Sequence, residues 1–199
     1  MSDIICVTSR KLCCEDFFTR LEKIAAAKPK AVILREHDLK RDEYIRTALK
    51  AADICSSYGV PFIPHSVFLP EENAPGYIHL KMEALRSMNG NTGKFSRIGV
   101  SCHSPEEAAE AEALGASYII AGHIFATDCK RGLPPRGLDY LKAVCNAVSI
   151  PVYGIGGISP DNVQSVREQG AAGACVMSGL MKCEDPAAYL RSFERGTEK

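Results

Sequence analysis

The 199-residue sequence has no excess of charge of either sign, no long apolar run and no pair of cysteines spaced as C-x-x-C. Lysine plus arginine and aspartate plus glutamate number 24 each, so charge gives no reason to expect binding to nucleic acid or an anionic membrane. A membrane-spanning helix needs about 18 consecutive apolar residues, and none occurs. We therefore expect an ordinary globular domain without a membrane span.

Nine cysteines are present, which is an odd number, so neither a disulfide framework nor a zinc knuckle is indicated. Cys6, Cys55, Cys145 and Cys175 fall in apolar segments, where a free thiol behaves as a small hydrophobic side chain. The first residues lack the basic region and apolar stretch of a secretory signal. We expect reduced cysteines and a cytoplasmic protein.

Short apolar runs alternate with helix-period segments along the chain. Such runs are typical of strands that are buried on both faces of a parallel sheet. Strands that alternate with helices imply right-handed crossovers. The predicted strands cover residues 4–8, 31–35, 61–64, 77–80, 97–101, 118–122, 151–155 and 174–177.

The predicted helices have apolar stripes and recognisable ends. Phe17, Leu21 and Ile24 recur at i, i+4 and i+7, which places one apolar stripe against a sheet. Ser104-Pro105-Glu106-Glu107 has the pattern of a capping box, and Gly115 would end that helix. Further helices are predicted around residues 45–52 and 138–148, and from Ser159-Pro160 and Asp185-Pro186.

Eight strands with intervening helices predict an α/β fold, a single compact (β/α)₈ TIM barrel over residues 1–199. Residues 64–76, "PHSVFLPEENAPG", contain two internal prolines, so the crossover after the third strand is expected to be short and irregular. A doubly wound open sheet is the alternative. No G-x-G-x-x-G follows the first strand, which ends in Thr8-Ser9-Arg10, and this counts against it.

All five histidines fall at or near the carboxyl end of a predicted strand, which is where a parallel barrel carries its chemistry. Together they indicate at least one functional histidine. Taken singly, four of them are interpreted as rim residues in water: His37, His65, His79 and His103.

Two glycine-containing loops predict a phosphate site. Gly156-Gly157 follows the seventh strand, and Ser178-Gly179 follows the eighth. Glycine lets backbone N–H groups approach an anion, and barrels commonly bind phosphate at these two loops. Ordinary turn glycines are the alternative.

Three stretches resemble the thiamine phosphate synthase/TenI superfamily. They are "VILREHDL" at residues 32–39, "RIGVSCHSPEEAAEAEALGASYIIAGHIFATDCKRG" at 97–132 and "IPVYGIGGISPDNVQSVREQGAAGACVMSGLM" at 150–181. The synthase branch usually has glycine-proline and then TxTK where this chain has Gly122-His123 and "TDCK". The latter pattern resembles TenI proteins, which are thiazole tautomerases.

The resemblance therefore implies an isomerase of thiamine biosynthesis that needs no cofactor. Its substrate would be the carboxythiazole phosphate made by thiazole synthase, which aromatises when a proton moves from C2 to the exocyclic carbon. An imidazole, with an ordinary pKa of about 6.5, suits such a proton transfer. We predict His123 as the catalytic residue, by its match to the TenI histidine.

A second comparison concerns Mg²⁺, which the synthase branch holds with two aspartates to handle a pyrophosphate. Ser66 and Ala84 stand at those positions here, and Ile33 and His37 replace a glutamine and a lysine of the family motif. Glu83 alone is a weak substitute. We predict no metal site, because the hard oxygen ligands that Mg²⁺ prefers are missing.

The remaining predicted roles concern substrate binding. Arg35 and Lys130 would bind the carboxylate or phosphate, and Ser101 would orient the ring. A nucleophilic role for Cys129 is not favoured, since nothing indicates acyl chemistry. The phosphate would be held by Gly156, Gly157, Ser178 and Gly179.

Two other functions remain open at this point. One is a thiamine phosphate synthase, a Mg²⁺-dependent transferase, with an altered metal site. The other is a non-catalytic regulator that binds a thiazole phosphate, because a binding site and an active site use the same loops. The sequence also leaves open whether the chain forms a dimer or tetramer, and whether the carboxythiazole phosphate would be its sole substrate.

Overall fold

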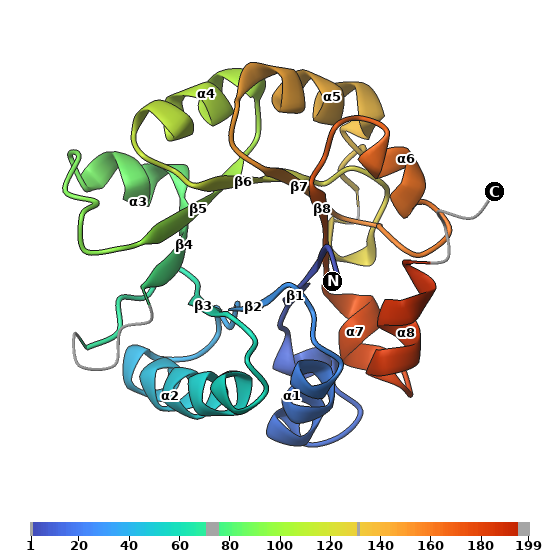
Figure 1. Ribbon diagram of the computed structural model, residues 1–199. Helices are drawn as coiled ribbons and strands as arrows, with labels where there is room; N and C mark the ends of the chain where they lie inside the picture. Colours follow the sequence, from blue (N-terminus) through green and yellow to red (C-terminus); the bar gives the residue numbers. More distant parts are fainter. Residues whose placement is uncertain (1, 71–75, 131, 195–199) are drawn as a thin grey trace.

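The computed structural model describes residues 2–70, 76–130 and 132–194, and it forms a barrel of eight parallel strands (Figure 1). The strand order is β3-β2-β1-β8-β7-β6-β5-β4. This confirms the (β/α)₈ architecture and places every predicted strand to within a residue at each end. The strands are β1 (Ile4–Val7), β2 (Ala31–Leu34), β3 (Phe62–Pro64), β4 (Tyr77–Lys81), β5 (Arg97–Cys102), β6 (Tyr118–Gly122), β7 (Val152–Ile155) and β8 (Gly173–Val176).

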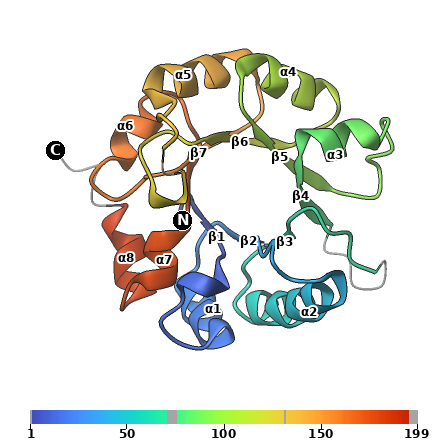
Figure 2. The ribbon, with the colours of Figure 1, turned by 180° about the vertical axis from the view of Figure 1, so that it is seen from behind.

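The helices lie outside the ring of strands, as the views from both ends show (Figures 1 and 2). The α-helices are α1 (Phe17–Ala26), α2 (Arg41–Ser57), α3 (Met82–Ser87), α4 (Pro105–Ala113), α5 (Gly137–Ala147), α6 (Val163–Arg167), α7 (Ser178–Lys182) and α8 (Pro186–Ser192). Short 3₁₀ turns occupy η1 (Arg10–Leu12) and η3 (Asp128–Lys130).

Alternating side chains of each strand pack in two separate apolar clusters, as the period of two requires. Ile5 and Val7 of β1 belong to the cluster inside the barrel, with Ile33, Tyr118 and other inward residues. Ile4 and Cys6 belong to the larger cluster between the strands and the helices. Burial on both faces explains why the strands read as continuous apolar runs.

Helix α4 begins as its sequence predicts, with one difference in the capping box. The Ser104 hydroxyl accepts a hydrogen bond from the Glu107 backbone N–H at 3.1 Å. The Glu107 carboxylate, however, accepts from the backbone N–H of His103 at 2.7 Å rather than from that of Ser104. Gly115 follows with φ +94°, a conformation that favours glycine.

The last two predicted helix starts have different outcomes. Asp185 caps α8, where its carboxylate accepts from the backbone N–H groups of Ala187 and Ala188. The prediction that Ser159-Pro160 starts a helix is wrong, because α6 begins at Val163. Residues 159–162 form a turn that leads into α6: the Ser159 carbonyl accepts from the backbone N–H groups of Asn162 and Val163, and the Asn162 amide oxygen accepts from the Ser159 N–H at 2.9 Å.

The barrel closes between β3 and β4 through a single parallel bridge that joins His65 and His79. The Ser66 backbone N–H donates to the His79 carbonyl at 2.8 Å across this joint. Residues 65–70, the described beginning of the crossover between the two strands, contain no helix. The rest of the predicted irregular segment, residues 71–75, lies outside the described residues.

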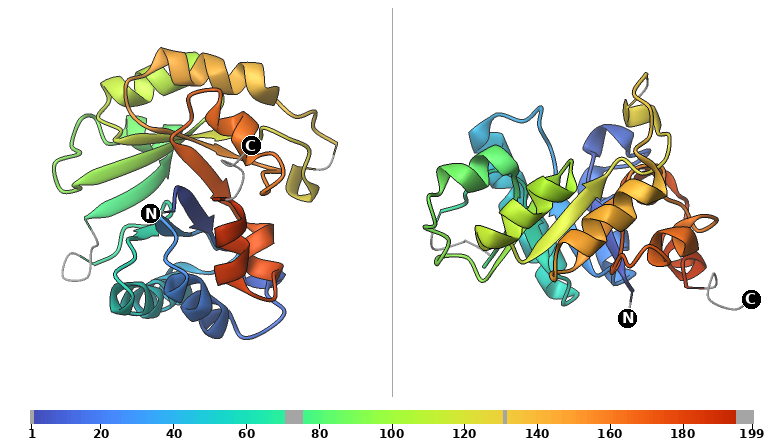
Figure 3. Two further views of the ribbon diagram at one scale, coloured as in Figure 1. Left: turned by 45° about the vertical axis from the view of Figure 1, so that its right-hand side comes forward. Right: turned by 90° about the horizontal axis from the view of Figure 1, so that it is seen from above.

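The two ends of the barrel differ. Viewed from the side, the loop that follows β6 (yellow) projects from one end, and the N-terminus lies toward the other (Figure 3). At the N-terminal end, Arg167 of α6 donates two hydrogen bonds to the Asp3 carboxylate, at 2.8 and 2.9 Å. In the described part of the chain, no helix is long and apolar enough to cross a membrane.

Candidate active site

A cavity of about 810 Å³ opens at the carboxyl ends of the strands, as expected for a parallel barrel. All five histidines and seven of the eight predicted site residues contribute to its lining. The seven are Arg35, Ser101, His123, Lys130, Gly156, Gly157 and Ser178.

The two glycines after β7 are needed for packing, besides their predicted role in phosphate binding. Gly156 and Gly157 have φ +100° and +66°. A Cβ on Gly156 would lie 2.4 Å from that of His123, and a Cβ on Gly157 would lie 2.5 Å from the Ala126 carbonyl oxygen. The two glycines therefore allow the loop after β7 to pack closely on the loop after β6.

Gly179 is placed differently from the other predicted site residues. It is not among the residues that line the cavity. A Cβ there would lie 2.1 Å from the Tyr189 hydroxyl, so the glycine allows α7 to pack on α8. Its predecessor Ser178 does line the cavity.

His123 stands at the entrance of the loop that follows β6 and is half-buried. Its Nε2 lies 3.4 Å from the Leu133 carbonyl oxygen. The Arg136 backbone N–H donates to the His123 carbonyl at 3.0 Å, so the loop folds back over its own start. The side chain of Cys129, in the same loop, lies outside the described residues.

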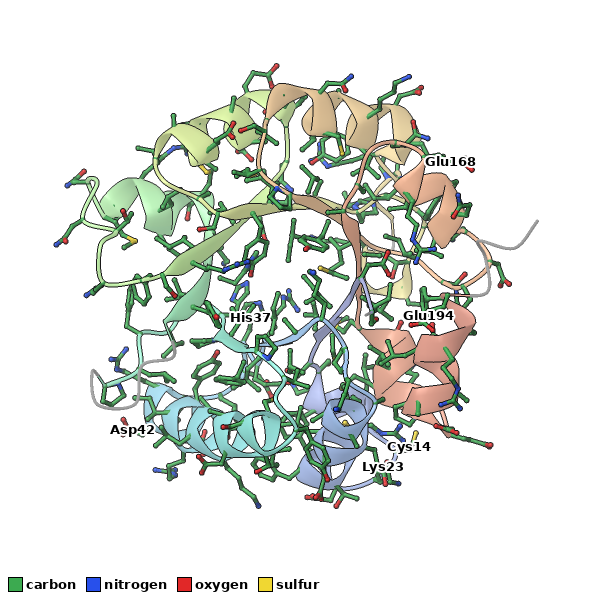
Figure 4. The ribbon with its side chains drawn as sticks, viewed as in Figure 1. Cys14, Lys23, His37, Asp42, Glu168 and Glu194 are labelled. Carbon is green, nitrogen blue, oxygen red and sulfur yellow. The ribbon has the colours of Figure 1, made fainter. Side chains whose placement is uncertain are left out.

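Three histidines and a tyrosine form a continuous row of rings on the other side of the cavity. The ring centroids are 5.1 Å apart for His37–His65, 5.4 Å for His65–His79 and 5.6 Å for His79–Tyr118. Figure 4 shows His37 beside β2 and β3, within the outline of the strand ring. The three imidazoles come from three successive strands, β2 to β4, or the loops that follow them.

The interpretation of these histidines as rim residues in water is wrong for His65 and His79, which are only 7% and 2% exposed. His79 lies within β4 rather than after it, and its side chain points into the barrel between those of Tyr77 and Lys81. His65 forms the bridge to His79. His37 and His103 are exposed, as predicted.

Burial keeps the inner imidazoles neutral. It lowers the pKa of His79 well below 6.5, with smaller effects of His65 and Arg35. Burial, with contributions from His37 and Arg35, lowers the pKa of His65 to about 3. Burial also lowers the pKa of His37, where Arg35 and Lys81 act in the same direction. Near pH 7 these rings therefore offer uncharged donors and acceptors.

His79 has partners on both nitrogens: Nδ1 lies 3.2 Å from the Tyr118 hydroxyl and Nε2 lies 2.8 Å from the Ser101 hydroxyl. A neutral imidazole donates from one nitrogen and accepts at the other. If the buried Tyr118 hydroxyl donates to Nδ1, then Nε2–H donates to Ser101. The Ser101 hydroxyl proton is then available to a ligand in the cavity.

Sequence reasoning missed a buried carboxylate that fixes the loop carrying Arg35. Glu36 is 5% exposed, and its carboxylate accepts from the Thr8 hydroxyl at 2.7 Å and from the Arg10 backbone N–H at 3.0 Å. Thr8 in turn accepts from the Arg35 backbone N–H at 3.1 Å. Burial raises the pKa of Glu36, and the two hydrogen bonds oppose this. A charged residue directly after an apolar strand was the available signal.

The residues at the ends of β3 and β4 do not fit a Mg²⁺ ion. Ser66 and Ala84 supply no carboxylate, and the imidazoles that line this wall are poor ligands for a hard cation. Glu83 and Glu107 also line the cavity, but Glu107 accepts the His103 N–H. Among the described residues, no group of three or more His, Cys, Asp and Glu side chains is arranged to hold a metal.

Comparison with known proteins identifies the family. The family described as "Thiamine monophosphate synthase" (TMP-TENI) matches residues 4–180, which is most of the chain and includes all eight strands. The chain belongs to the TMP-TENI family.

Relatives within the family match most of the chain. A thiamine-phosphate synthase of Clostridium acetobutylicum is 35% identical, over 89% of this chain and 86% of the relative. A thiamine-phosphate synthase of Fusobacterium nucleatum is 33% identical, over 92% and 90%. The structure of a thiamine phosphate pyrophosphorylase from Pyrococcus furiosus superposes with a TM-score of 0.82 at 25% identity, covering 98% of this chain and 95% of that one.

These relatives correct the functional prediction made from the sequence. The predicted isomerase, a thiazole tautomerase, is wrong, since TMP-TENI relatives at 31–35% identity carry the name thiamine-phosphate synthase. Such a synthase is a transferase. The prediction rested on a few local positions, namely Gly122-His123, "TDCK" and the missing aspartates at Ser66 and Ala84, whereas the similarity to synthases extends over 89% of the chain.

Proposed function

We propose that this chain is a thiamine-phosphate synthase, a transferase that joins a pyrimidine pyrophosphate and a thiazole phosphate with release of pyrophosphate. The observation that carries the proposal is the similarity to synthases over 89% of the chain, together with a cavity at the carboxyl ends of the strands. A volume of about 810 Å³ is within the range of cavities that take small molecules, and it suits two ligands side by side.

The site residues divide between two walls of the cavity in this proposal. Gly156, Gly157 and Ser178 hold the thiazole phosphate by backbone N–H groups and a hydroxyl, while Lys130 neutralises it. Ser101, whose hydroxyl hydrogen-bonds His79, donates to an acceptor on the pyrimidine ring. His123 lines the wall between them and positions the substrates. The role of Gly179 is to seat α7 on α8.

The proposed enzyme acts in the cytoplasm on small phosphorylated molecules. The described cysteines are free thiols, which agrees with the reducing conditions of a cytoplasmic enzyme. The partners are small phosphorylated molecules, with neither nucleic acid nor membrane involved. A single TIM-barrel domain over residues 1–199 and assembly into a dimer or tetramer remain part of the proposal.

The decisive experiment is a direct assay of thiamine phosphate formation by the purified chain. We expect the product to accumulate when pyrimidine pyrophosphate and thiazole phosphate are both supplied, measured by chromatography of the oxidised fluorescent product. Ser178→Ala should raise KM for the thiazole phosphate, because a hydroxyl contact to phosphate is lost. Lys142→Gln, on the exposed side of α5, is the control and should behave as the parent chain.

A second candidate is a non-catalytic binding protein, and the missing carboxylates at Ser66 and Ala84 favour it. This protein would bind thiazole phosphate at the same loops without turnover. Saturable binding of thiazole phosphate in calorimetry, with no thiamine phosphate formed under any metal condition, would support this function over the synthase.

A further inference from the structure

The wall of the cavity formed by β2, β3 and β4 presents one layer of inward-pointing residues. Ile33 pairs in register with Ile63, and both point into the barrel. Two residues further along, on the same face, stand Arg35 and His65. On β4, Lys81 follows the inward His79 by the same spacing and pairs in register with Ser101.

Two cations in this layer have no acidic partner. Arg35 and Lys81 both line the cavity, and neither forms an ion pair with any residue that the structure describes. Both lie close enough to act on His37 and His65 electrostatically. Among the other cations that line the cavity, Arg86 pairs with Glu110 at 2.6 Å and Arg136 donates to the His103 carbonyl at 2.8 Å. Lys130 belongs to the loop after β6 and not to this wall.

His65 sits between these cations and lacks a partner itself. It is 7% exposed, lines the cavity, and its buried Nδ1 has no hydrogen-bond partner among the described residues. Its backbone N–H is used, donating to the Tyr44 hydroxyl at 2.8 Å. Buried polar atoms nearly always have a hydrogen-bond partner, and a bound water or ion is one group that can supply it.

We propose that Arg35, His65 and Lys81 form an anion subsite that binds a phosphate or pyrophosphate group directly, with no divalent cation between the protein and the anion. The identity of the ligand as a pyrophosphate ester rests on the proposed function. The two cations supply positive charge, and all three side chains can form hydrogen bonds to the anion. In the Mg²⁺-binding branch of the family, the metal ion supplies the positive charge. This wall replaces carboxylate ligands with groups that contact the anion themselves.

The direct test is calorimetric titration of the full chain with inorganic pyrophosphate in EDTA and, separately, in excess Mg²⁺. We expect saturable binding in EDTA that Mg²⁺ does not strengthen, because Mg²⁺ reduces the charge that the protein side chains recognise. Binding that occurs only with Mg²⁺ would overturn the subsite.

Substitutions in this wall test whether the anion binds there. Lys81→Gln should weaken pyrophosphate binding in EDTA by about tenfold, the effect of one charge-assisted hydrogen bond. Lys81→Arg should retain most of the affinity, and Lys142→Gln should leave it unchanged. Equal affinities for Lys81→Gln and Lys142→Gln would place the anion elsewhere and overturn the proposal. Arg35→Gln provides a second variant should Lys81→Gln fail to fold.

The experiments distinguish failure of the subsite proposal from failure of the proposed synthase function. Pyrophosphate binding in EDTA that depends on Lys81, in a chain that forms no thiamine phosphate, supports the subsite and overturns the synthase function. Thiamine phosphate formation combined with strictly Mg²⁺-dependent pyrophosphate binding supports the function and overturns the subsite.

Discussion

Among single residues, His65 has the clearest effect on the charge of the cavity wall. Burial keeps its ring uncharged although it lies beside two cations. An exposed histidine near Arg35 and Lys81 would be protonated by mild acid and would add to their repulsion. The buried ring avoids this, since its pKa is lowered to about 3 by burial, with His37 and Arg35 assisting. The wall therefore keeps its charge constant over the physiological pH range.

This shift predicts how stability depends on pH. Between about pH 6.5 and pH 3 an unfolded chain binds a proton at residue 65, whereas the folded chain does not. The free energy of unfolding should therefore fall as the pH is lowered through that window. His65→Asn should make this fall shallower, measured by urea unfolding at several pH values. His37, His79, Arg35 and Lys81 surround the ring and remain in the variant.

Lys142→Gln controls for a general loss of stability in the same measurement, since it lies on the exposed side of α5. An identical pH dependence for His65→Asn and Lys142→Gln would contradict a neutral, buried His65.

Sequence reasoning placed all five histidines at the mouth of the barrel, but it could not see that His65 and His79 are buried. Their burial depends on the inward face of β4 and on the closing joint, which are tertiary features.

Among the elements, the helix starts show which local signals determine structure. Asp185-Pro186 and Ser104-Pro105 each begin a helix, because the cap side chain accepts backbone N–H groups of the first turn. Ser159-Pro160 has the same local pattern but forms a turn that leads into α6, and no hydrogen bond of the Ser159 hydroxyl to the first turn accompanies it among the described residues. The short helices α3, α6 and α7 have too few residues for a readable apolar period.

Removal of the α4 cap should destabilise the barrel. Ser104→Ala leaves the Glu107 N–H without its acceptor at 3.1 Å, so we expect a loss of about 1 kcal/mol. The measurement is the free energy of unfolding in urea. Ser104→Asp retains an acceptor at the same place and should lose less. Equal losses for the two variants would show that the cap does not contribute.

At the scale of the whole molecule, the strands of the ring are not all paired to the same extent. Strand β7 is paired on both sides, with β6 and with β8. Strand β3 is paired along its length with β2 alone, and it meets β4 only at the bridge between His65 and His79. The alternation of strands and helices predicted the ring itself. The position of its weakest joint follows from the irregular segment after β3, which carries no periodic pattern.

Hydrogen exchange should reveal this joint. The backbone amides of Phe62, Ile63, His65 and Ser66 are expected to exchange faster than those of β7 (Val152–Ile155), because a strand with one full neighbour opens at lower free energy. Exchange measured by mass spectrometry on peptides from the two regions provides the comparison. Equal protection would mean that the ring opens only as a whole.

Arg35 and Lys81 belong to opposite sides of the joint between β3 and β4, since Arg35 follows β2 and Lys81 ends β4. A substrate that contacts both side chains connects the first three strands of the chain to the last five. Ligand binding of this kind lowers the population of locally opened molecules, and proteases cleave such molecules preferentially. On the proposed function, the supply of substrate would then govern how long each copy of the protein survives in the cell, in addition to how fast it works.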